Sequence, residues 1–366
     1  MAPRDLEQPP EADRFGETPH PRETFNLFGH AETERALLQS YRNGTLPQAF
    51  LFGGPSGIGK ATLAWRLARF ILAHPDPAAR QVLAATDLFV APDHPVARQI
   101  VSLSHADLML LRREWNEKTK KPFTDIRVDD IRRAIHMFQQ AAGAGGYRIA
   151  ILDSSEDLNT SGANALLKLI EEPPPRSLFL IVAHRPGQVL ATIRSRCRKL
   201  QLKPLMDSEI LATIESLGAP WSVAAPADRA AAISVAKGSL HEVLRRLGGQ
   251  GGDLDERIRQ MLEALPQVDW RNVHDLADHV VSRENGADYD MMLGTVYDWL
   301  SAQVRRGAEE GEGGGINLVR RLAPFAEVWE KVTEAARETE VLNLDKRPLV
   351  LSIFADLAAA ARASST

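Results

Sequence analysis

The stretch "AFLFGGPSGIGKATLAWRLARFILA", residues 49–73, decides the fold of this chain. It begins with the short apolar run AFLF (49–52), which predicts a buried strand, and it ends in a segment (61–73) with apolar residues at helical spacing. The pattern G-x-x-x-x-G-K lies between them, from Gly54 to Lys60. A strand, a glycine-rich loop and a helix in this order are the context that a phosphate-binding loop requires.

The loop has the residues for binding phosphate, but it lacks one of the residues that bind magnesium. Its glycines allow successive backbone N–H groups to face a phosphate, and Lys60 would reach the β and γ oxygens. The next position, where a Ser or Thr hydroxyl normally binds magnesium, is Ala61. Thr62 follows, but one helical step turns its hydroxyl about 100° away. A purely structural glycine-rich turn is the alternative, and occupancy by ATP, by ADP or by neither stays open.

Apolar strands and helices alternate well beyond this stretch. Buried strands are predicted at 147–152, 178–183 and near 198–202, with helices between them. This alternation predicts an α/β domain over residues 24–205, with a parallel sheet covered by helices on both faces. The strand at 147–152 ends at Asp153, which would complete the magnesium site or would simply cap a turn. The predicted nucleotide-binding residues are therefore Gly54, Pro55, Ser56, Gly57, Ile58, Gly59, Lys60, Ala61, Thr62 and Asp153.

The rest of the chain predicts further parts of different character. Residues 75–124 are irregular in pattern, and 113–125 predict an exposed charged loop or hairpin. Residues 206–250 predict three short helices, with a glycine-rich linker at 248–253. Longer amphipathic helices follow over 251–366, so the last domain is predicted to be all-α. The first 23 residues are acidic and rich in proline, which predicts a flexible extension.

Length and composition limit the class of protein. A chain of 366 residues is too long for one core, so two or three domains are expected. The net charge of −4 and the pI of about 6.2 disfavour a free-standing nucleic-acid binder. No run of about 18 apolar residues and no secretory signal is present, so a cytoplasmic setting without membrane contact is expected. The single cysteine, Cys197, excludes an internal disulfide and a cysteine-clustered zinc site, so no metal is expected.

One stretch carries a family resemblance. "NALLKLIEEPPPRSLFLIVAHRPGQVLATIRSRC" (164–197) resembles the clamp-loader branch of AAA+ proteins, which includes bacterial gamma/tau motor and delta-prime subunits and eukaryotic replication factor C. The resemblance implies a P-loop AAA+ domain, a three-helix lid and a helical collar for oligomerisation, and "NLDKRPLVLSIFADLA" (343–358) resembles that collar. Many members bind zinc through four cysteines, which this chain lacks, so zinc is not carried over.

Within that branch, this chain departs from the motor subunits at four positions. The motors have Thr or Ser at the position of Ala61 and a Glu that polarises water at the position of Ser154. His184 and His241 stand where the motors have a sensor Thr or Asn and a phosphate-sensing Arg; both histidines are more typical of packing contacts than of metal ligands. Together these departures are similar to the delta-prime type, and they imply that the chain's own ATPase site is degenerate.

The "SRC" motif is intact, and the resemblance implies that Arg196 is an arginine finger that reaches ATP on a neighbouring subunit. A basic solvated edge is the alternative, because Arg194, Arg198 and Lys199 lie beside it. The implied function is that of a non-motor subunit of the bacterial DNA polymerase III clamp loader, which loads the sliding clamp onto primed DNA. Its partners would be the gamma/tau and delta subunits. The chain would have no activity of its own, although it would be a subunit of a DNA-directed DNA polymerase (nucleotidyltransferase) holoenzyme.

Three other functions stay open from the sequence. A true motor ATPase is disfavoured by Ala61 and Ser154. A small-molecule P-loop kinase shares the loop pattern, but it leaves the 164–197 stretch and the helical C-terminus unexplained. A non-replicative P-loop scaffold fits the loop equally well.

Overall fold

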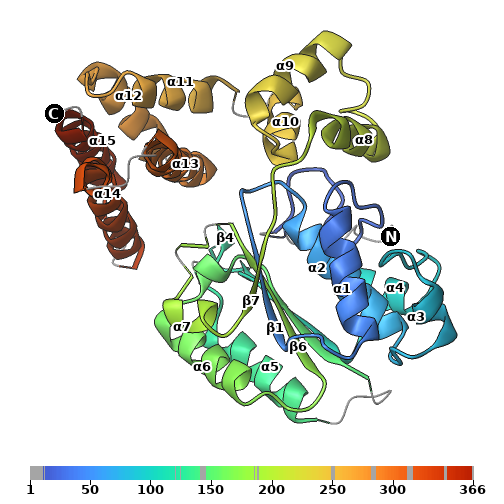
Figure 1. Ribbon diagram of the computed structural model, residues 1–366. Coiled ribbons are helices and arrows are strands. Elements are labelled where there is room, and N and C mark those ends of the chain that lie inside the picture. The colour runs from blue at the N-terminus through green and yellow to red at the C-terminus, as the bar shows by residue number, and fades with distance from the viewer. Residues whose placement is uncertain are drawn as a thin grey trace, which may run out of the picture. The chain divides into compact units, whose positions relative to one another are not determined.

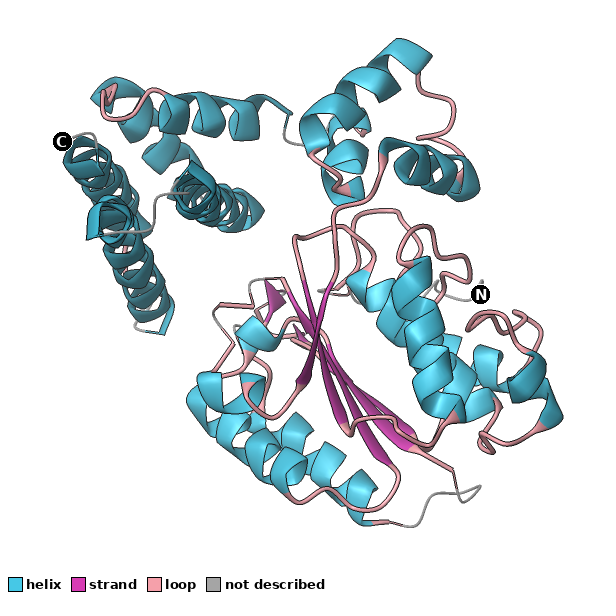
Figure 2. Cartoon of the chain, in the orientation of Figure 1, coloured by secondary structure: helices cyan, strands magenta, loops and turns pink. Residues whose placement is uncertain are grey.

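In the computed structural model the described residues run from 11 to 364, apart from 12, 120, 124, 141–145, 185, 188, 249–251, 282–285, 311–315 and 342–343. Residues 1–10 of the predicted extension, most of the predicted linker, and parts of the breaks between the last helices lie outside these ranges. The chain divides into two units, Met1–Gly248 and Gly249–Thr366. Figures 1 and 2 show their elements.

A five-stranded sheet forms the centre of the first unit. Its order is β2-β5-β6-β1-β7, and every neighbouring pair is parallel. This arrangement confirms the predicted AAA+-like α/β fold with a parallel sheet. The strands are β1 (Ala49–Gly53), β2 (Leu108–Leu111), β5 (Arg148–Leu152), β6 (Ser177–Ala183) and β7 (Arg198–Gln201).

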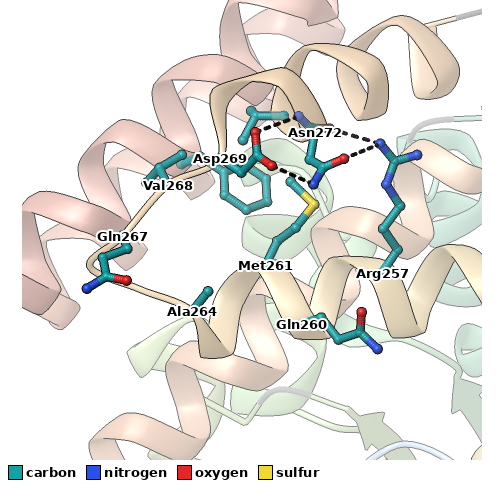
Figure 3. Close-up of a pocket in the computed structure, with 10 residues that line it drawn as sticks. Arg257, Gln260, Met261, Ala264, Gln267, Val268, Asp269 and Asn272 are labelled. Carbon is teal, nitrogen blue, oxygen red and sulfur yellow. Dashed lines mark hydrogen bonds between the residues drawn. The ribbon is translucent and has the colours of Figure 1, made fainter.

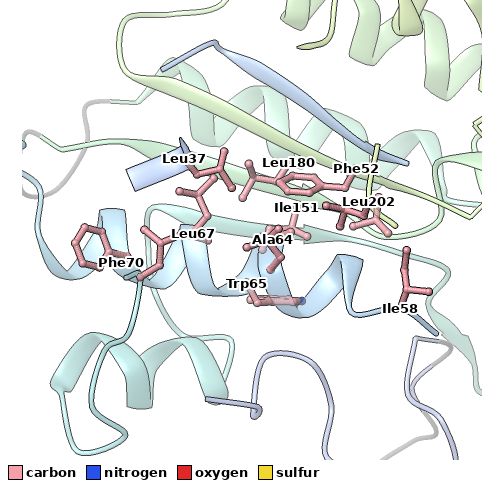
Figure 4. Close-up of a cluster of buried hydrophobic side chains, with 14 of the residues drawn as sticks. Leu37, Phe52, Ile58, Ala64, Trp65, Leu67, Phe70, Ile151, Leu180 and Leu202 are labelled. Carbon is pink, nitrogen blue, oxygen red and sulfur yellow. The ribbon is translucent and has the colours of Figure 1, made fainter. Parts of the chain in front are cut away.

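Helices cover both faces of the sheet, and alternate residues of each strand point to opposite faces. Phe50 and Phe52 of β1 pack in one apolar cluster with α1 (Ala31–Arg42), α2 (Lys60–Ala73) and α4 (Pro95–Val101). Figure 4 shows Phe52 among residues of this cluster, which include Leu180 of β6 and Leu67 of α2. The intervening residues Ala49 and Leu51 pack in a second cluster with α5 (Val128–Gln139), α6 (Thr160–Glu171) and α7 (Ala191–Arg194).

The region 75–124 contains more regular structure than its sequence predicts. It forms α3 (Arg80–Ala84), α4 and the edge strand β2, all of which are too short to give a clear periodic signal. A small antiparallel hairpin then follows, β3 (Trp115–Asn116) and β4 (Lys121–Pro122), within the segment predicted as a loop or hairpin.

The start of α5 corrects two details of the sequence prediction. The stretch IRVDDIRRAIHMFQQAAG (126–143) predicts a short strand and then a helix capped near Asp129. In the structure the residue that precedes the helix is Arg127, whose side chain makes no cap hydrogen bond. Asp129 and Asp130 lie in the first turn instead, where negative charge favours the helix dipole. The strand predicted just before the helix is reduced to one isolated bridge, between Ile126 and Leu158.

The N-terminal segment corrects the prediction of a flexible extension over residues 1–23. Residues 13–25, here called the strap, pack against α2 with His20 and Arg22 buried. Asp13 Oδ2 lies 2.8 Å from His20 Nε2, and Arg22 Nη1 lies 2.7 Å from Glu11 Oε1. These acidic residues are therefore neutralised by partners within the fold rather than by solvent.

The three helices predicted for residues 206–248 form as α8 (Asp207–Leu217), α9 (Pro226–Ala236) and α10 (Leu240–Leu247). Ile210, Ile214 and Val243 are buried in the same apolar cluster as α1 and α2. These three helices, referred to below as the lid, thus share one core with the sheet.

The second unit is helical throughout its described residues, as predicted. Its helices are α11 (Gly252–Glu263), α12 (Trp270–Val281), α13 (Gly286–Glu310), α14 (Ile316–Val341) and α15 (Lys346–Ser364). They surround an apolar cluster of their own, to which Leu276, Val350 and Phe354 belong. Among the described residues, no helix has both the length and the apolar character needed to cross a membrane.

Candidate functional site

The glycine-rich loop joins β1 to α2 in a backbone conformation that favours glycine. The φ angles of Gly54, Gly57 and Gly59 are +146°, +73° and +90°, a range that other residues seldom adopt. At Gly54 an added Cβ would lie 2.7 Å from Ile58 Cδ1 and 2.9 Å from the carbonyl oxygen of Leu202. Because α2 begins at Lys60, directly after these glycines, the loop leads into a helix N-terminus, which is the backbone arrangement that binds phosphate.

Lys60 bonds to the loop's own backbone. Its side chain is buried, and Nζ donates hydrogen bonds to the carbonyl oxygens of Gly54, at 2.8 Å, and Pro55. His30 Nε2 lies 2.7 Å from the carbonyl oxygen of Ile58 on the other side of the loop. The loop is therefore held closed by interactions within the chain.

Asp153 lies at the end of β5, where its backbone N–H donates to the carbonyl oxygen of Leu111 at 3.0 Å. The pKa of its carboxyl is raised to about 7, mainly by burial and also by the charge of Asp13, while the charge of Lys60 acts in the opposite direction. His184 Nε2 lies 4.0 Å from Asp153 Oδ1. The structure thus brings Lys60, Asp153 and His184 together.

The raised pKa of Asp153 predicts how Asp153→Asn changes stability with pH. The unfolded chain releases this proton near pH 3.8, whereas the folded chain keeps it until about pH 7, so the wild type loses stability as pH rises between these values. Asparagine has no such proton to release. The variant should therefore gain stability relative to wild type from pH 4 to pH 8, by on the order of 4 kcal/mol. Urea unfolding at both pH values measures this.

The exposed Asp93 provides the matched control for that experiment. Asp93→Asn should change stability by the same small amount at pH 4 and at pH 8. If both variants change in stability relative to wild type by the same amount between pH 4 and pH 8, burial at Asp153 does not disfavour its charged form.

The metal-binding and base positions of a hydrolytic site are incomplete. Ala61, half-buried at the start of α2, presents only a methyl group where a metal-binding hydroxyl is needed. Ser154 adopts a left-handed φ of +61° and leads into a short 3₁₀ turn, Ser155–Asp157. Glu156 contributes to the raised pKa of Asp153, but no carboxylate directly follows Asp153 in the chain. Gly57, Gly59 and Lys60 thus lie in the arrangement of a phosphate loop, while the side chains that follow Lys60 and Asp153 are a methyl group and a hydroxyl.

The lid contacts the phosphate loop directly. The backbone N–H of Leu240 donates to the carbonyl oxygen of Gly57, and Ser239 Oγ donates to that of Ser56, both at 2.9 Å. An added Cβ at Gly57 would lie only 2.3 Å from His241 Cβ. His241 is therefore a packing residue of the loop, and its burial lowers the pKa of its ring. Sequence spacing gave no sign of this contact, because 184 positions separate Gly57 from His241.

Arg196 follows α7, on the opposite face of the sheet from α2 and the lid (Figure 1). Its side chain is 41% exposed, and Nη2 lies 2.6 Å from Glu171 Oε1 at the end of α6. Nη1 also donates to the carbonyl oxygen of Thr192 at 3.0 Å. The guanidinium is thus accessible to another molecule yet fixed in direction. The neighbouring Cys197 is buried, which raises its pKa to about 11, so its thiol is not a nucleophile at neutral pH.

Figure 3 shows a pocket in the second unit that has no connection with the loop. Its volume is about 160 Å³, and its polar side chains bind one another. Asn272 donates to Asp269 at 2.9 Å and accepts from Arg257 at 3.2 Å. Asp269 also accepts from the backbone N–H groups of Arg271 and Asn272, so it caps the start of α12. These polar groups have structural partners, and they offer no reactive group.

Comparison with known proteins shows which family this chain resembles. Residues 29–206 match the family described as "DNA polymerase III, delta subunit". The DNA polymerase III subunit delta' of Pseudomonas aeruginosa is 28% identical over 284 residues, which cover 76% of this chain and 78% of that protein. The Escherichia coli subunit delta' is 26% identical over 246 residues, which cover 66% and 67%. The chain thus resembles the DNA polymerase III delta' subunits, and the family match covers just under half of its length.

A second group of similar proteins matches this chain over a shorter length. The DNA polymerase III subunit gamma/tau of Mycobacterium tuberculosis is 32% identical over 177 residues, which cover 48% of this chain and 28% of that protein. Among solved structures, a gamma subunit-related protein from Thermotoga maritima has a TM-score of 0.35 at 14% identity and covers 91% of this chain and all of its own. A likeness at that score carries no weight for the fold, which the sheet itself establishes.

Proposed function

We propose that this chain is the non-motor, delta'-type subunit of a bacterial DNA polymerase III clamp loader, which takes part in ATP-dependent loading of the sliding clamp onto primed DNA. Its similarity to subunits named delta' and gamma/tau supports a role in that assembly. Its partners would be the gamma/tau motors and the delta subunit, with primed DNA and the clamp bound by the complete complex. Such a complex works in the cytoplasm.

The observation that carries the non-motor assignment is the missing chemistry beside the phosphate loop. Ala61 offers no metal ligand, and Ser154 has no basicity at neutral pH where a motor needs a general base. Lys60 already bonds to the loop's carbonyl groups. These features favour a degenerate site, one that holds at most a nucleotide and does not turn it over.

Arg196 supplies the second half of the proposal. A guanidinium presented to the ATP of a neighbouring motor would neutralise charge on the transferring phosphoryl group. The ion pair with Glu171 at 2.6 Å favours this role, because it aims the side chain before the partner arrives. The chain's own site and its contribution to catalysis would then be separate, on opposite faces of one sheet.

The proposed domain roles follow the predicted boundaries: an AAA+ domain over 24–205, a lid over 206–250 and an oligomerisation collar over 251–366. The second unit's independent apolar cluster is consistent with a separate assembly module. The lid, by contrast, shares an apolar cluster with the AAA+ domain.

Hydrolysis by the isolated chain tests the non-motor assignment. The purified protein should release phosphate from ATP at least about 10²–10⁴-fold more slowly than a gamma/tau motor subunit, since general-base catalysis alone contributes that much. Mixed with motor and delta subunits, it should co-elute with them and enable clamp loading that the mixture lacks without it. Hydrolysis at the motor's rate would favour the motor alternative, and failure to co-elute would favour the unrelated scaffold.

A further inference from the structure

The strap, residues 13–25, is fixed to the helix that follows the phosphate loop. Arg69 of α2 donates to the carbonyl oxygens of Arg22, at 2.6 Å, and Thr24, at 3.3 Å, and its guanidinium lies 4.2 Å from the ring centroid of Phe25. Arg66, one turn earlier, donates to the carbonyl oxygen of Phe25. Both arginines are buried on a helix that is otherwise largely apolar. The strap's backbone thus accepts hydrogen bonds from both guanidinium groups, and Arg66 also pairs with Glu34 of α1 at 2.8 Å, so α2 holds the strap in place.

Ion pairs hold the beginning of the strap at the carboxyl edge of the sheet. Asp13 pairs with Arg112, which directly follows β2, and with His20 at 2.8 Å. His20 Nδ1 accepts from the backbone N–H of Arg22, so His20 Nε2 is the atom that donates to Asp13. Glu11 lies 2.8 Å from the same Arg112. Two carboxylates thus converge on one arginine at the end of a sheet strand.

That edge is the place where the predicted nucleotide site lies. Leu111, the residue before Arg112, accepts the backbone N–H of Asp153, so the ends of β2 and β5 are adjacent. Parallel sheets bind ligands at the carboxyl ends of their strands. Asp13, which pairs with Arg112, therefore holds the strap at the edge of the sheet where Asp153 lies.

Farther along, the strap also reaches the lid. The ring centroids of Phe15 and His241 are 4.0 Å apart. His241 in turn packs on Gly57, and the neighbouring Leu240 bonds to the carbonyl oxygen of Gly57. Strap, lid and phosphate loop therefore form one continuous stack, with Phe15 on its outer side.

We propose that the strap is an intramolecular inhibitor of the phosphate loop. Phe15 holds the lid on Gly57, and Asp13, paired with Arg112, anchors the strap at the end of β2, so nucleotide binds only after this part of the strap has moved away. The inference deepens the proposed function, because it gives the non-hydrolytic loop a regulated occupancy. In the assembled ring, release of the strap would couple nucleotide binding at this subunit to a change in the lid.

Nucleotide binding by full-length variants tests the proposal. Phe15→Ala removes the contact with His241, and Asp13→Asn removes the charge while keeping the side chain's size. Glu17→Gln is the matched control, since Glu17 lies in the same segment but is exposed. The probe is N-methylanthraniloyl-ATP, titrated with fluorescence detection. Apparent affinity scales with the fraction of chains in which the strap has moved away from the loop. The variant that combines Phe15→Ala with Asp13→Asn should therefore bind the nucleotide at least about tenfold more tightly than wild type. Glu17→Gln should bind it with wild-type affinity.

Trypsin cleavage after Arg14 or Arg22 provides a second readout. It should be faster in Phe15→Ala and Asp13→Asn than in wild type, and saturating ATP should accelerate it in wild type. Thermal melting shows which variants fold. If Asp13→Asn does not fold, the comparison of Phe15→Ala with wild type is sufficient. Equal affinity in wild type and folded variants, including no binding in any of them, would overturn the proposal. Because every arm uses the isolated chain, that failure is distinct from a failure to assemble with motor and delta subunits.

Discussion

Replacing Arg196 with alanine should lower ATP hydrolysis at the adjacent motor site by about 10³–10⁵-fold, the contribution typical of an arginine finger. The side chain is 41% exposed and is aimed by Glu171, so its loss should remove a transition-state contact without disturbing the core. The measurement is single-turnover hydrolysis in a reconstituted ring in which only the motor site next to this chain is competent. Clamp and primed DNA are present, and ring assembly is checked by co-elution.

The neighbouring Arg194 offers a matched control. It donates to the carbonyl oxygen of Pro186 at 3.3 Å, and it carries the same charge within two residues of Arg196. Arg194→Ala should leave hydrolysis nearly unchanged, while Glu171→Gln should cause a smaller loss, on the order of tenfold, by loosening the guanidinium. Equal losses in Arg194→Ala and Arg196→Ala would indicate a general basic edge. An unchanged rate in an assembled Arg196→Ala ring would exclude the finger.

The parts of the fold that the sequence predicts well are those whose signals are local. The strand, loop and helix around Gly54 and Lys60 follow one another within 25 residues, so their order alone defines the motif. The strands at 147–152 and 178–183 are continuous apolar runs, as expected for strands buried on both faces. The edge strand β2 has only four residues, and three of them are half-buried, so its signal is too weak to separate it from a loop.

The strap shows why composition wrongly predicts disorder for a segment whose ion-pair partners lie far away in the sequence. Its proline and acidic residues are typical of disordered segments. However, Asp13 finds Arg112 almost a hundred positions away, and Arg69 on α2 binds the strap's backbone. Buried arginines on α2 are a signal that the sequence does contain, because a helix facing a purely apolar core would not carry them. The contact between His241 and Gly57 has no equivalent local sign.

Phe354→Ala should destabilise the second unit by about 3–5 kcal/mol, the cost of emptying a fully buried aromatic site. Phe354 of α15 is 1% exposed, and it belongs to a cluster with Leu276 of α12 and Val350 of α15. No residue of this cluster belongs to the clusters around the sheet. The second unit should therefore unfold at a lower temperature while the first unit is unaffected, which differential scanning calorimetry would resolve as a shift in one of two transitions.

Trp270→Ala provides the comparison for this change, because Trp270 on α12 is equally aromatic but 45% exposed. It should alter the stability of the second unit by less than about 0.5 kcal/mol, as exposed positions usually do. If the second unit is the collar of the ring, Phe354→Ala should also weaken co-elution with motor and delta subunits at about 37 °C. Near that temperature, a loss of several kcal/mol is enough to unfold a marginally stable domain. Trp270→Ala should assemble normally if its exposed ring lies outside the interface. A single transition that shifts as a whole in Phe354→Ala would mean that the two units unfold together. If the ring assembles fully while the second unit is unfolded, the second unit does not form the ring interface.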